Sequence, residues 1–195
     1  HSLASKLGAL TNALQQYSVT PDDPLLAQDV LNEANDLASA LNAASQTASD
    51  VRKQADADMA AGVERVNGLL TQFEQVNKMI VKGSQANADT TDLQDSRDKI
   101  LSQLSEEIGI STVTRGNNDM VIYTDSGVTL FETVPRSVTM APSYALAPGV
   151  SGNAVYIDGV AVTGPNAIMP LKSGQIYGSA VIRDDVAVVY QGQLD

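Results

Sequence analysis

The side chains best placed to do chemistry are two arginines that each precede an aspartate, in the pairs Arg97-Asp98 and Arg183-Asp184. Each arginine falls at or beside the apolar face of an expected helix. A buried guanidinium needs a carboxylate or several carbonyl groups as partners, whereas an arginine at the edge of a helical bundle extends its charged end into water. The pattern leaves both interpretations open. In both, we expect the two arginines to serve folding rather than catalysis.

Paired carboxylates occur at Asp22-Asp23, Glu106-Glu107 and Asp184-Asp185. A glycosidase holds two carboxylates on opposite sides of a sugar in an aromatic-lined cleft, but this sequence has no Trp, six Tyr and two Phe. We therefore interpret these acids as helix caps and surface charge.

The string that begins Asp56-Ala57-Asp58 starts like a calcium-binding loop. Ala60 stands where the third ligand should be, and the glycine comes one residue late, at Gly62. We expect a solvated helix face here instead of a metal site.

Composition excludes several other kinds of site. The sequence has no cysteine and its one histidine is His1, which excludes disulfides, Cys/His zinc sites, thiol catalysis and an internal Ser-His-Asp triad. A net charge of −11 repels nucleic acid and anionic lipid, and no window approaches the ~20 apolar residues of a membrane span. We expect no enzymatic activity, no catalytic residue, no cofactor and no metal.

Apolar residues recur at spacings of three and four through the first 108 residues, which indicates amphipathic helices. One helix is expected over 2–18, from Leu3, Leu7, Leu10, Leu14 and Tyr17. After the segment SVTPDDP, in which Asp22 or Asp23 caps and Pro24 begins the next helix, a second is expected over 24–82.

The apolar seam of the long helix contains one irregularity, a 4-4 step across Val51, Ala55 and Met59 that is typical of a stutter. Gly62 and Gly68 mark the stretch where a bend is expected. Such a helix would extend about 90 Å at ~1.5 Å per residue, so it needs partner helices. The candidates are 2–18, 89–108 and 174–195.

The second part of the chain changes to a period of two. Residues 109–195 contain ten of the fourteen glycines and five of the seven prolines. Hairpins are expected from 110–114 to 120–123 and on to 128–131, and from 155–157 to 160–162. The sequence therefore predicts an α+β fold: an elongated antiparallel helical bundle, 1–108 with 173–195, that carries an inserted antiparallel β domain, 109–172. The two ends of that β domain should lie close together.

Three segments carry family motifs in the same order along the chain. PDDPLLAQDVLNEANDLASALN occupies 21–42, and LQDSRD (93–98) places Asp95, Arg97 and Asp98 on L-x-D-x-R-D. The motif residues of 173–195 are Gly174, Ile176, Gly178, Arg183, Asp184, Tyr190, Leu194 and Asp195. These segments resemble the family of flagellar hook-associated protein 1, the hook–filament junction proteins. Ala27, Ser173 and Val188 depart from it, where the family commonly has Arg, Gly and Pro.

This resemblance implies a non-enzymatic structural component of the bacterial flagellum, exported through the type III channel without a cleaved signal peptide and located outside the cell. It implies that the helices pack against copies of the same subunit in a ring and that the β domain projects outward. The implied partners are the hook protein, hook-associated protein 3 and an export chaperone.

The sequence lacks an initiator Met and begins inside an expected helix, so we expect a central fragment without the family's terminal segments. Two alternatives stay open at this point. One is another axial protein, such as hook-associated protein 3 or flagellin, although the 173–195 motif argues against it. The other is a secreted coiled-coil adhesin or binding module, which would carry a ligand site on its β part.

Overall fold

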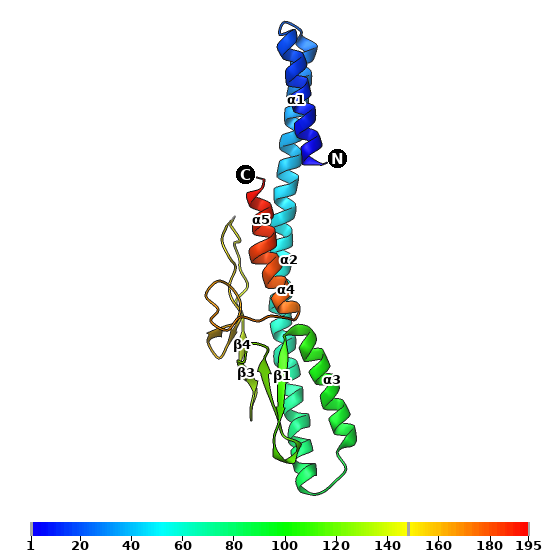
Figure 1. Cartoon of the computed structure of the whole chain (residues 1–195), viewed down its shortest axis with the longest axis vertical. Helices are drawn as coiled ribbons and strands as arrows, with labels where there is room; N and C mark the ends of the chain where they lie inside the picture. The colour runs from blue at the N-terminus through cyan, green and yellow to red at the C-terminus, as the bar shows by residue number, and fades with distance from the viewer. Residues whose placement is uncertain (1, 148, 195) are drawn as a thin grey trace. The chain divides into compact units, whose positions relative to one another are not determined.

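The computed structural model describes residues 2–147 and 149–194, and the ribbon is drawn in Figure 1. The chain divides into two compact units. One comprises 1–50 with 190–195 and the other 51–189. Helix α2, Pro24–Gln85, and helix α5, Ala187–Gly192, each contribute residues to both units.

The smaller unit is built around a helical hairpin of α1, Leu3–Val19, and the first part of α2. Ser2 caps α1 by accepting a hydrogen bond from the Ser5 amide, and Asp23 accepts one from the Leu25 amide at the start of α2. The expected capping role of Asp23 is therefore confirmed. Both caps satisfy amide groups that have no partner inside their helix.

The apolar face of α1 is narrower than the sequence predicted. Leu3, Leu10 and Tyr17 are half-buried, but Leu7 and Leu14 are 57% and 48% exposed. A helix that faces one neighbour buries a single row of positions three and four residues apart, and leucines beside that row stay in water. The prediction of one inward face is therefore wrong at Leu7 and Leu14.

Helix α2 continues without a break through Gly62 and Gly68, where a bend was expected. Its buried row also differs from the predicted seam. Val51 is 42% exposed, whereas Arg52 is fully buried. The 4-4 step therefore lies seven residues earlier, at Ala44, Ala48 and Arg52, because the predicted seam followed apolar residues and the inward position is occupied by a charged one, Arg52.

The larger unit combines helices with two three-stranded antiparallel sheets, which confirms the α+β class. Helix α3 is Thr91–Glu107. The first sheet has the order β1-β2-β3, formed by Ile110–Thr114, Met120–Thr124 and Thr129–Phe131; the second has the order β4-β5-β6, formed by Val138–Thr139, Tyr156–Ile157 and Val160–Ala161. The expected hairpins are present.

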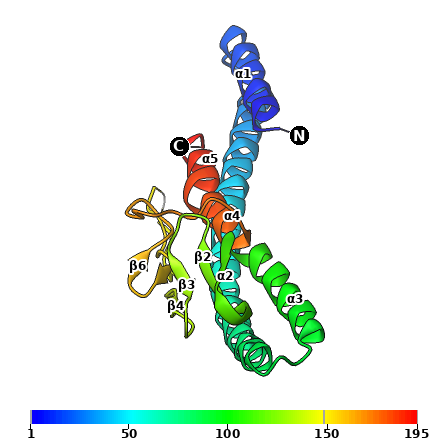
Figure 2. The ribbon, with the colours of Figure 1, turned by 60° about the horizontal axis from the view of Figure 1, so that its bottom comes forward.

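Residues with positive φ form the tight turns of these hairpins. Asn117 and Asn118 have φ of 56° and 59°, and Asp158 and Gly159 have φ of 47° and 82°. Asn, Asp and Gly tolerate this conformation best. In Figure 2 the first sheet lies beside α2 and α3.

One hydrophobic core serves all of these elements. It includes Val66, Leu70 and Phe73 of α2, Leu104 of α3, and strand residues such as Phe131. The rings of Phe73 and Phe131 meet edge to face with centroids 4.9 Å apart. The β strands therefore complete the core of the helices they follow.

The C-terminal helical segment was predicted as one helix over 174–195. It consists of α4, Gln175–Val181, a π-helical turn, Ile182–Val186, and α5. Residue 195, the last residue of the family motif, lies outside the described residues, as do residues 1 and 148. No helix among the described residues has both the length and the apolarity that crossing a bilayer requires.

The two ends of the β-rich segment are adjacent, as expected: the Gly109 amide donates to the Ser173 carbonyl at 3.1 Å.

Because these ends are adjacent, residues 112–172 can be replaced by a short Gly/Ser linker without stretching the chain. Because the strands share the core with α2 and α3, we expect the shortened protein to lose cooperative thermal unfolding, monitored by circular dichroism. A cooperative melt with the helical content of α2 and α3 would instead support an independent β domain.

Candidate functional site: a buried arginine cluster

Arg183 is fully buried and binds two aspartates. Its Nη1 donates to Oδ1 of Asp56 at 2.5 Å, and its Nε and Nη2 donate to the two carboxylate oxygens of Asp184 at 3.0 and 2.7 Å. Nη2 also donates to the Asn153 carbonyl. Burial by itself lowers the pKa of Arg183, but the hydrogen bonds and charges of Asp184 and Asp56 outweigh it and raise that pKa. This arginine therefore remains charged.

Arg52, also fully buried, donates to carbonyl groups. Its Nε donates to the Arg183 carbonyl at 3.0 Å, and its two terminal nitrogens donate to the carbonyls of Leu146, Ala147 and Val150. Burial lowers the pKa of Arg52, and the charge of Asp184 opposes that effect. Since the Arg183 carbonyl lies within the π-helical turn, Arg52 links this turn to the 146–150 stretch.

The two aspartates also hold the segment 143–153. Asp56 accepts a hydrogen bond from the Ser143 amide at 2.7 Å, and Asp184 accepts one from the Gly152 amide at 2.9 Å. A Cβ added at Gly152 would lie 2.5 Å from Cζ of Arg183, so only glycine fits there. We name Arg52, Asp56, Arg183 and Asp184 the arginine cluster. It joins α2, the π-helical turn and the segment 143–153.

A second set of polar residues surrounds Arg97, at the turn between β1 and β2. Arg97 is 5% exposed and donates to the Asn118 carbonyl at 2.7 Å and to Oδ1 of Asn77 at 3.4 Å. Its Nε has no hydrogen-bond partner. Burial lowers the pKa of Arg97, and the charges of Asp98 and Asp119 oppose that effect. Carbonyl and amide oxygens thus bind this arginine, while Asp95 and Asp98 are exposed.

The two motif glycines occupy different environments. Gly174 has φ of 94°, and a Cβ there would lie 2.7 Å from the Glu107 carbonyl oxygen, so its backbone conformation and the space around it both require glycine. Nothing lies within 4 Å of a Cβ built at Gly178. Tyr190, in the smaller unit, is 45% exposed.

Three acids are less exposed than the sequence predicted. Asp56 was expected on a solvated helix face but is 4% exposed, and Glu107, expected as surface charge, is 8% exposed and binds Arg65 through both oxygens. Asp184 was also expected at the surface, but its side chain is 9% exposed. The burial of Asp56 could have been predicted only from that of Arg52, which lies four residues earlier on the same side of α2.

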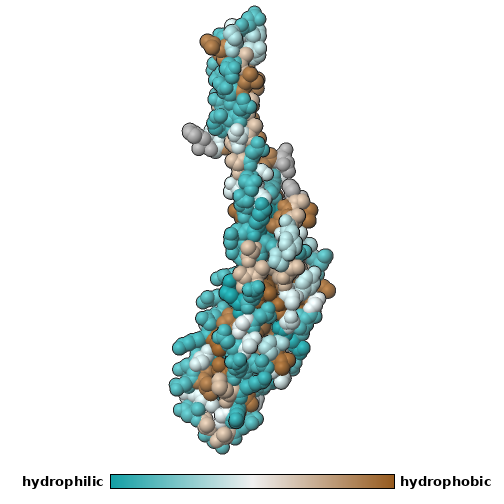
Figure 3. Space-filling model, turned by 180° about the vertical axis from the view of Figure 1, so that it is seen from behind, coloured by the Kyte–Doolittle hydropathy of each residue, from teal (hydrophilic) through white to brown (hydrophobic). Residues whose placement is uncertain are grey.

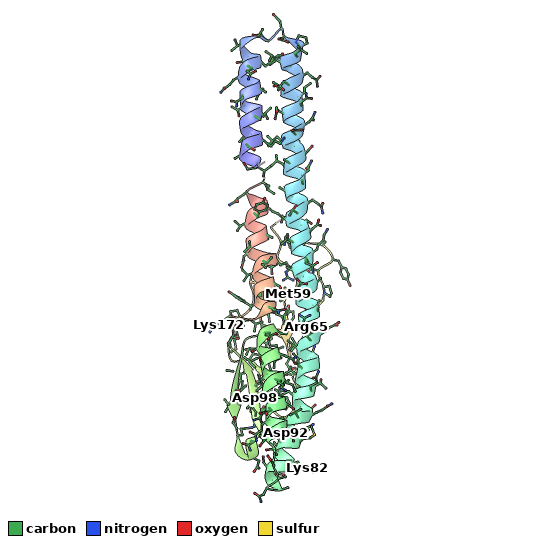
Figure 4. The ribbon with its side chains drawn as sticks, turned by 90° about the vertical axis from the view of Figure 1, so that its right-hand side faces the viewer. Met59, Arg65, Lys82, Asp92, Asp98 and Lys172 are labelled. Atoms are coloured by element: carbon green, nitrogen blue, oxygen red, sulfur yellow. The ribbon has the colours of Figure 1, made fainter. Side chains whose placement is uncertain are left out.

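This arrangement suits stabilisation better than chemistry. The charge of Arg183 is neutralised by Asp56 and Asp184, and the donors of both arginines bind oxygens of the protein itself. In the part of the chain that the structure describes, no three His, Asp or Glu residues gather in a way that could hold a metal ion. Figure 4 shows Met59 and Arg65 on α2 with Asp98 on α3; Arg65 spans from α2 to Glu107, the last residue of α3.

Comparison with known proteins identifies the family. The model of the flagellar hook-associated protein FlgK helical domain matches residues 1–195. The chain belongs to the FlgK helical-domain family. This is a family of structural flagellar proteins, in agreement with the resemblance carried by the three sequence segments.

Individual FlgK relatives agree with this assignment. The chain is 24% identical over 163 residues to flagellar hook-associated protein 1 of Escherichia coli K12, covering 82% of this chain and 29% of that protein. It is 25% identical over 147 residues to the Salmonella typhimurium protein of the same name, covering 74% and 27%. The chain thus spans less than a third of these relatives.

A solved structure has the same fold. The flagellar hook junction protein FlgK from Burkholderia pseudomallei matches with a TM-score of 0.74 and 24% identity, covering 94% of this chain and 33% of that one. The mixed architecture of helices and small sheets is therefore shared with a FlgK protein.

The first prediction for the arginine cluster concerns stability. Replacing Arg183 by Ala leaves two buried carboxylates without their cation, which should lower the free energy of unfolding by about 3–5 kcal/mol. Arg136→Ala is the matched control, since that side chain is 39% exposed and pairs with Glu132 and Asp158 near the surface; it should cost less than about 1 kcal/mol. Urea titration measures both, and equal losses would contradict the prediction.

The second prediction concerns Arg52. Replacing it by Ala removes the donors of several carbonyls in the segment 143–153 without touching α3. Hydrogen exchange should then accelerate at the amides of Ser143 and Gly152, while the amides of α3 keep their protection. Uniform acceleration through the larger unit would mean that Arg52 acts only through global stability.

Proposed function

We propose that this chain is the helical domain of a structural subunit that joins the flagellar hook to the filament. The observation that carries the proposal is the FlgK helical-domain match over residues 1–195. The relatives named flagellar hook-associated protein 1, and the B. pseudomallei protein described as a flagellar hook junction protein, support it. The arginine cluster and the surroundings of Arg97 support a non-enzymatic role, because these arginines bind carboxylate, carbonyl and amide oxygens of the protein itself.

In this proposal the subunit acts outside the cell after export without a cleaved signal peptide. Its partners are copies of itself in a ring, the hook protein, hook-associated protein 3 and an export chaperone. Eight of the motif residues are proposed to serve structure or assembly: Asp95, Arg97, Asp98, Gly174, Gly178, Arg183, Asp184 and Tyr190. In the assembled subunit, 1–108 with 173–195 are proposed as the helical domain that contacts neighbouring copies, and the solvent-exposed surface of 109–172 is proposed to face outward.

The arginine cluster supplies a physical basis for a mechanical joint. Sliding of the π-helical turn along α2 would separate Arg183 from Asp56 and Arg52 from the Arg183 carbonyl. Each separation leaves a charge or carbonyl buried without a partner, which costs far more than losing an exposed ion pair. A domain held together in this way would transmit force between neighbouring subunits without sliding of the π-helical turn along α2.

Complementation tests the proposal. A strain that lacks the gene for the whole subunit should make hooks without attached filaments, and the intact gene should restore filaments in electron micrographs and swimming in soft agar. Arg183→Ala in the whole subunit should restore few filaments, whereas Arg136→Ala should restore normal numbers. Normal filaments in the strain without the gene would overturn the proposed function.

A further inference from the structure

Two of the four edge strands in the described sheets are covered by other parts of the chain. Beside β3, the Arg136 amide donates to the Leu130 carbonyl at 2.8 Å. Beside β4, the side chain of Asn67 accepts a hydrogen bond from the Val138 amide and donates one to the Val138 carbonyl. A third edge strand, β6, is two residues long, and so short a strand offers little to an additional one.

Strand β1, the fourth edge, has no partner on its outer side. Just beyond its two ends, the Gly109 carbonyl and the Arg115 amide are hydrogen-bonded to the residues that flank β2. Hydrogen-bonded positions alternate along an antiparallel ladder, so the odd-numbered residues of β1 bond to β2 in the observed register. The amides and carbonyls of Ile110, Thr112 and Thr114 therefore point away from β2, and no described residue forms a hydrogen bond with them.

The outer side of β1 is also exposed to water. Residues 111–114 are all exposed, and Val113 is 52% exposed. The strand contains neither a charged residue nor a proline, which are features that keep an additional strand away from a sheet edge. Arg115, which follows the strand, donates to the Glu132 carbonyl instead of covering the edge. Strand β1 is therefore open to a further strand.

An open groove of about 470 Å³ lies between β1 and α3, which are neighbours in Figure 1. Leu101, Ser102 and Ser105 of α3 line it, together with Asp98. Leu101 is half-buried and packs against the hydrophobic core. Asp98 is the one charged residue that lines the groove, and it forms no hydrogen bond or ion pair with a described residue. The groove therefore combines an apolar floor with an unpaired negative charge.

The hydrophobic core extends as far as β1. Met120 and Ile122 of β2 belong to the core and stand opposite Thr114 and Thr112 in the register. Opposite residues of an antiparallel pair lie on the same face of the sheet, so a strand added beside β1 would extend this face. The lower part of Figure 3 shows only small hydrophobic patches among hydrophilic residues of the larger unit. The face drawn there offers a partner no broad apolar area to compare with the open edge of β1.

We propose that β1 binds an extended, basic segment of another protein chain, which adds a fourth strand to the first sheet. The outward amides and carbonyls of Thr112 and Thr114 fix the backbone of the occupant, because an extended chain presents donors and acceptors at the matching spacing. Asp98 fixes its charge, because a Lys or Arg side chain in the groove gains an ion pair without breaking an existing one.

This pairing goes beyond the proposed function, because it assigns a binding edge and the chemistry of the segment that occupies it. The contact is one-sided, since β1 supplies the edge and the partner supplies the strand. It therefore requires no two-fold axis between copies of the subunit.

Amide hydrogen exchange tests whether the edge is open. The amides of Thr112 and Thr114 should exchange at least about a hundredfold faster than those of Ser111 and Val113, which bond to β2. NMR measures these rates in this chain, and mass spectrometry measures them in the whole subunit. Slow exchange of Thr112 and Thr114 in the whole subunit would assign the edge to another segment of the same subunit and overturn the proposal.

The binding probe is the peptide Lys-Thr-Val-Thr-Lys, acetylated and amidated at its ends. It reads the same in both directions, so one lysine reaches the Asp98 end of the groove in either orientation. We expect a dissociation constant on the order of 1 mM. At nine-tenths saturation, exchange of Thr112 should slow about tenfold, while that of Val113 stays unchanged. The matched control, Glu-Thr-Val-Thr-Glu, should bind at least about tenfold more weakly.

Variants of the chain separate the backbone contribution from the charge. Thr112→Pro removes an outward amide without removing a hydrogen bond to β2, as proline does at sheet edges, and should weaken peptide binding at least about tenfold. Thr112→Val keeps that amide and should bind like the parent. Asp98→Asn should weaken binding about threefold and make it nearly independent of salt. Thermal melts monitored by circular dichroism establish that each variant folds, and the two peptides test the proposal even if Thr112→Pro does not.

Four results with the peptide would overturn the proposal. They are no binding of Lys-Thr-Val-Thr-Lys, equal affinity for both peptides, unchanged affinity in folded Thr112→Pro, and slow exchange of Thr112 in concentrated chain without peptide. The last result would assign the edge to a second copy of this chain. None of these measurements depends on hook or filament assembly, so they fail or succeed separately from the complementation experiment.

Discussion

Two arginines and two aspartates buried in one place set the arrangement of the larger unit. Taking charged groups out of water is costly unless every charge has a partner and the remaining donors bind oxygen atoms. The arginine cluster meets that condition only when α2, the π-helical turn and the segment 143–153 are all in position. Each of these elements therefore constrains the other two, and a shift in any of them would leave a buried charged group without its partner.

Apolar packing and polar anchors make different contributions along α2. From Met59 to Phe73 the buried side chains of α2 belong to the hydrophobic core, and such contacts tolerate small sliding movements. The arginine cluster, the Arg65–Glu107 pair and the hydrogen bonds of Arg97 do not, because hydrogen bonds depend on distance and direction. The polar contacts therefore set the register of α2 against α3 and the segment 143–153.

The two units differ in how their acidic residues are placed. In the larger unit, buried acids are matched by arginines, so acidity is neutralised inside. In the smaller unit, the acids of α2 lie mostly in water and α1 has none.

The sequence by itself determined the positions of α1, α2 and α3, the hairpins and their turns, and the α+β class, because these follow from local periodicity, proline and glycine. It left open whether Arg183 is buried with a partner or extends into water. The tertiary structure alone decided that Arg52 and not Val51 faces inward, that Asp56 and Glu107 are buried, and that Leu7 and Leu14 are not. The spacing of apolar residues predicts which face of a helix is buried. It does not predict the burial of a charged residue, which depends on partners far away in the chain. Arg183 lies 127 residues from Asp56 and 131 from Arg52, and only the folded chain brings them together.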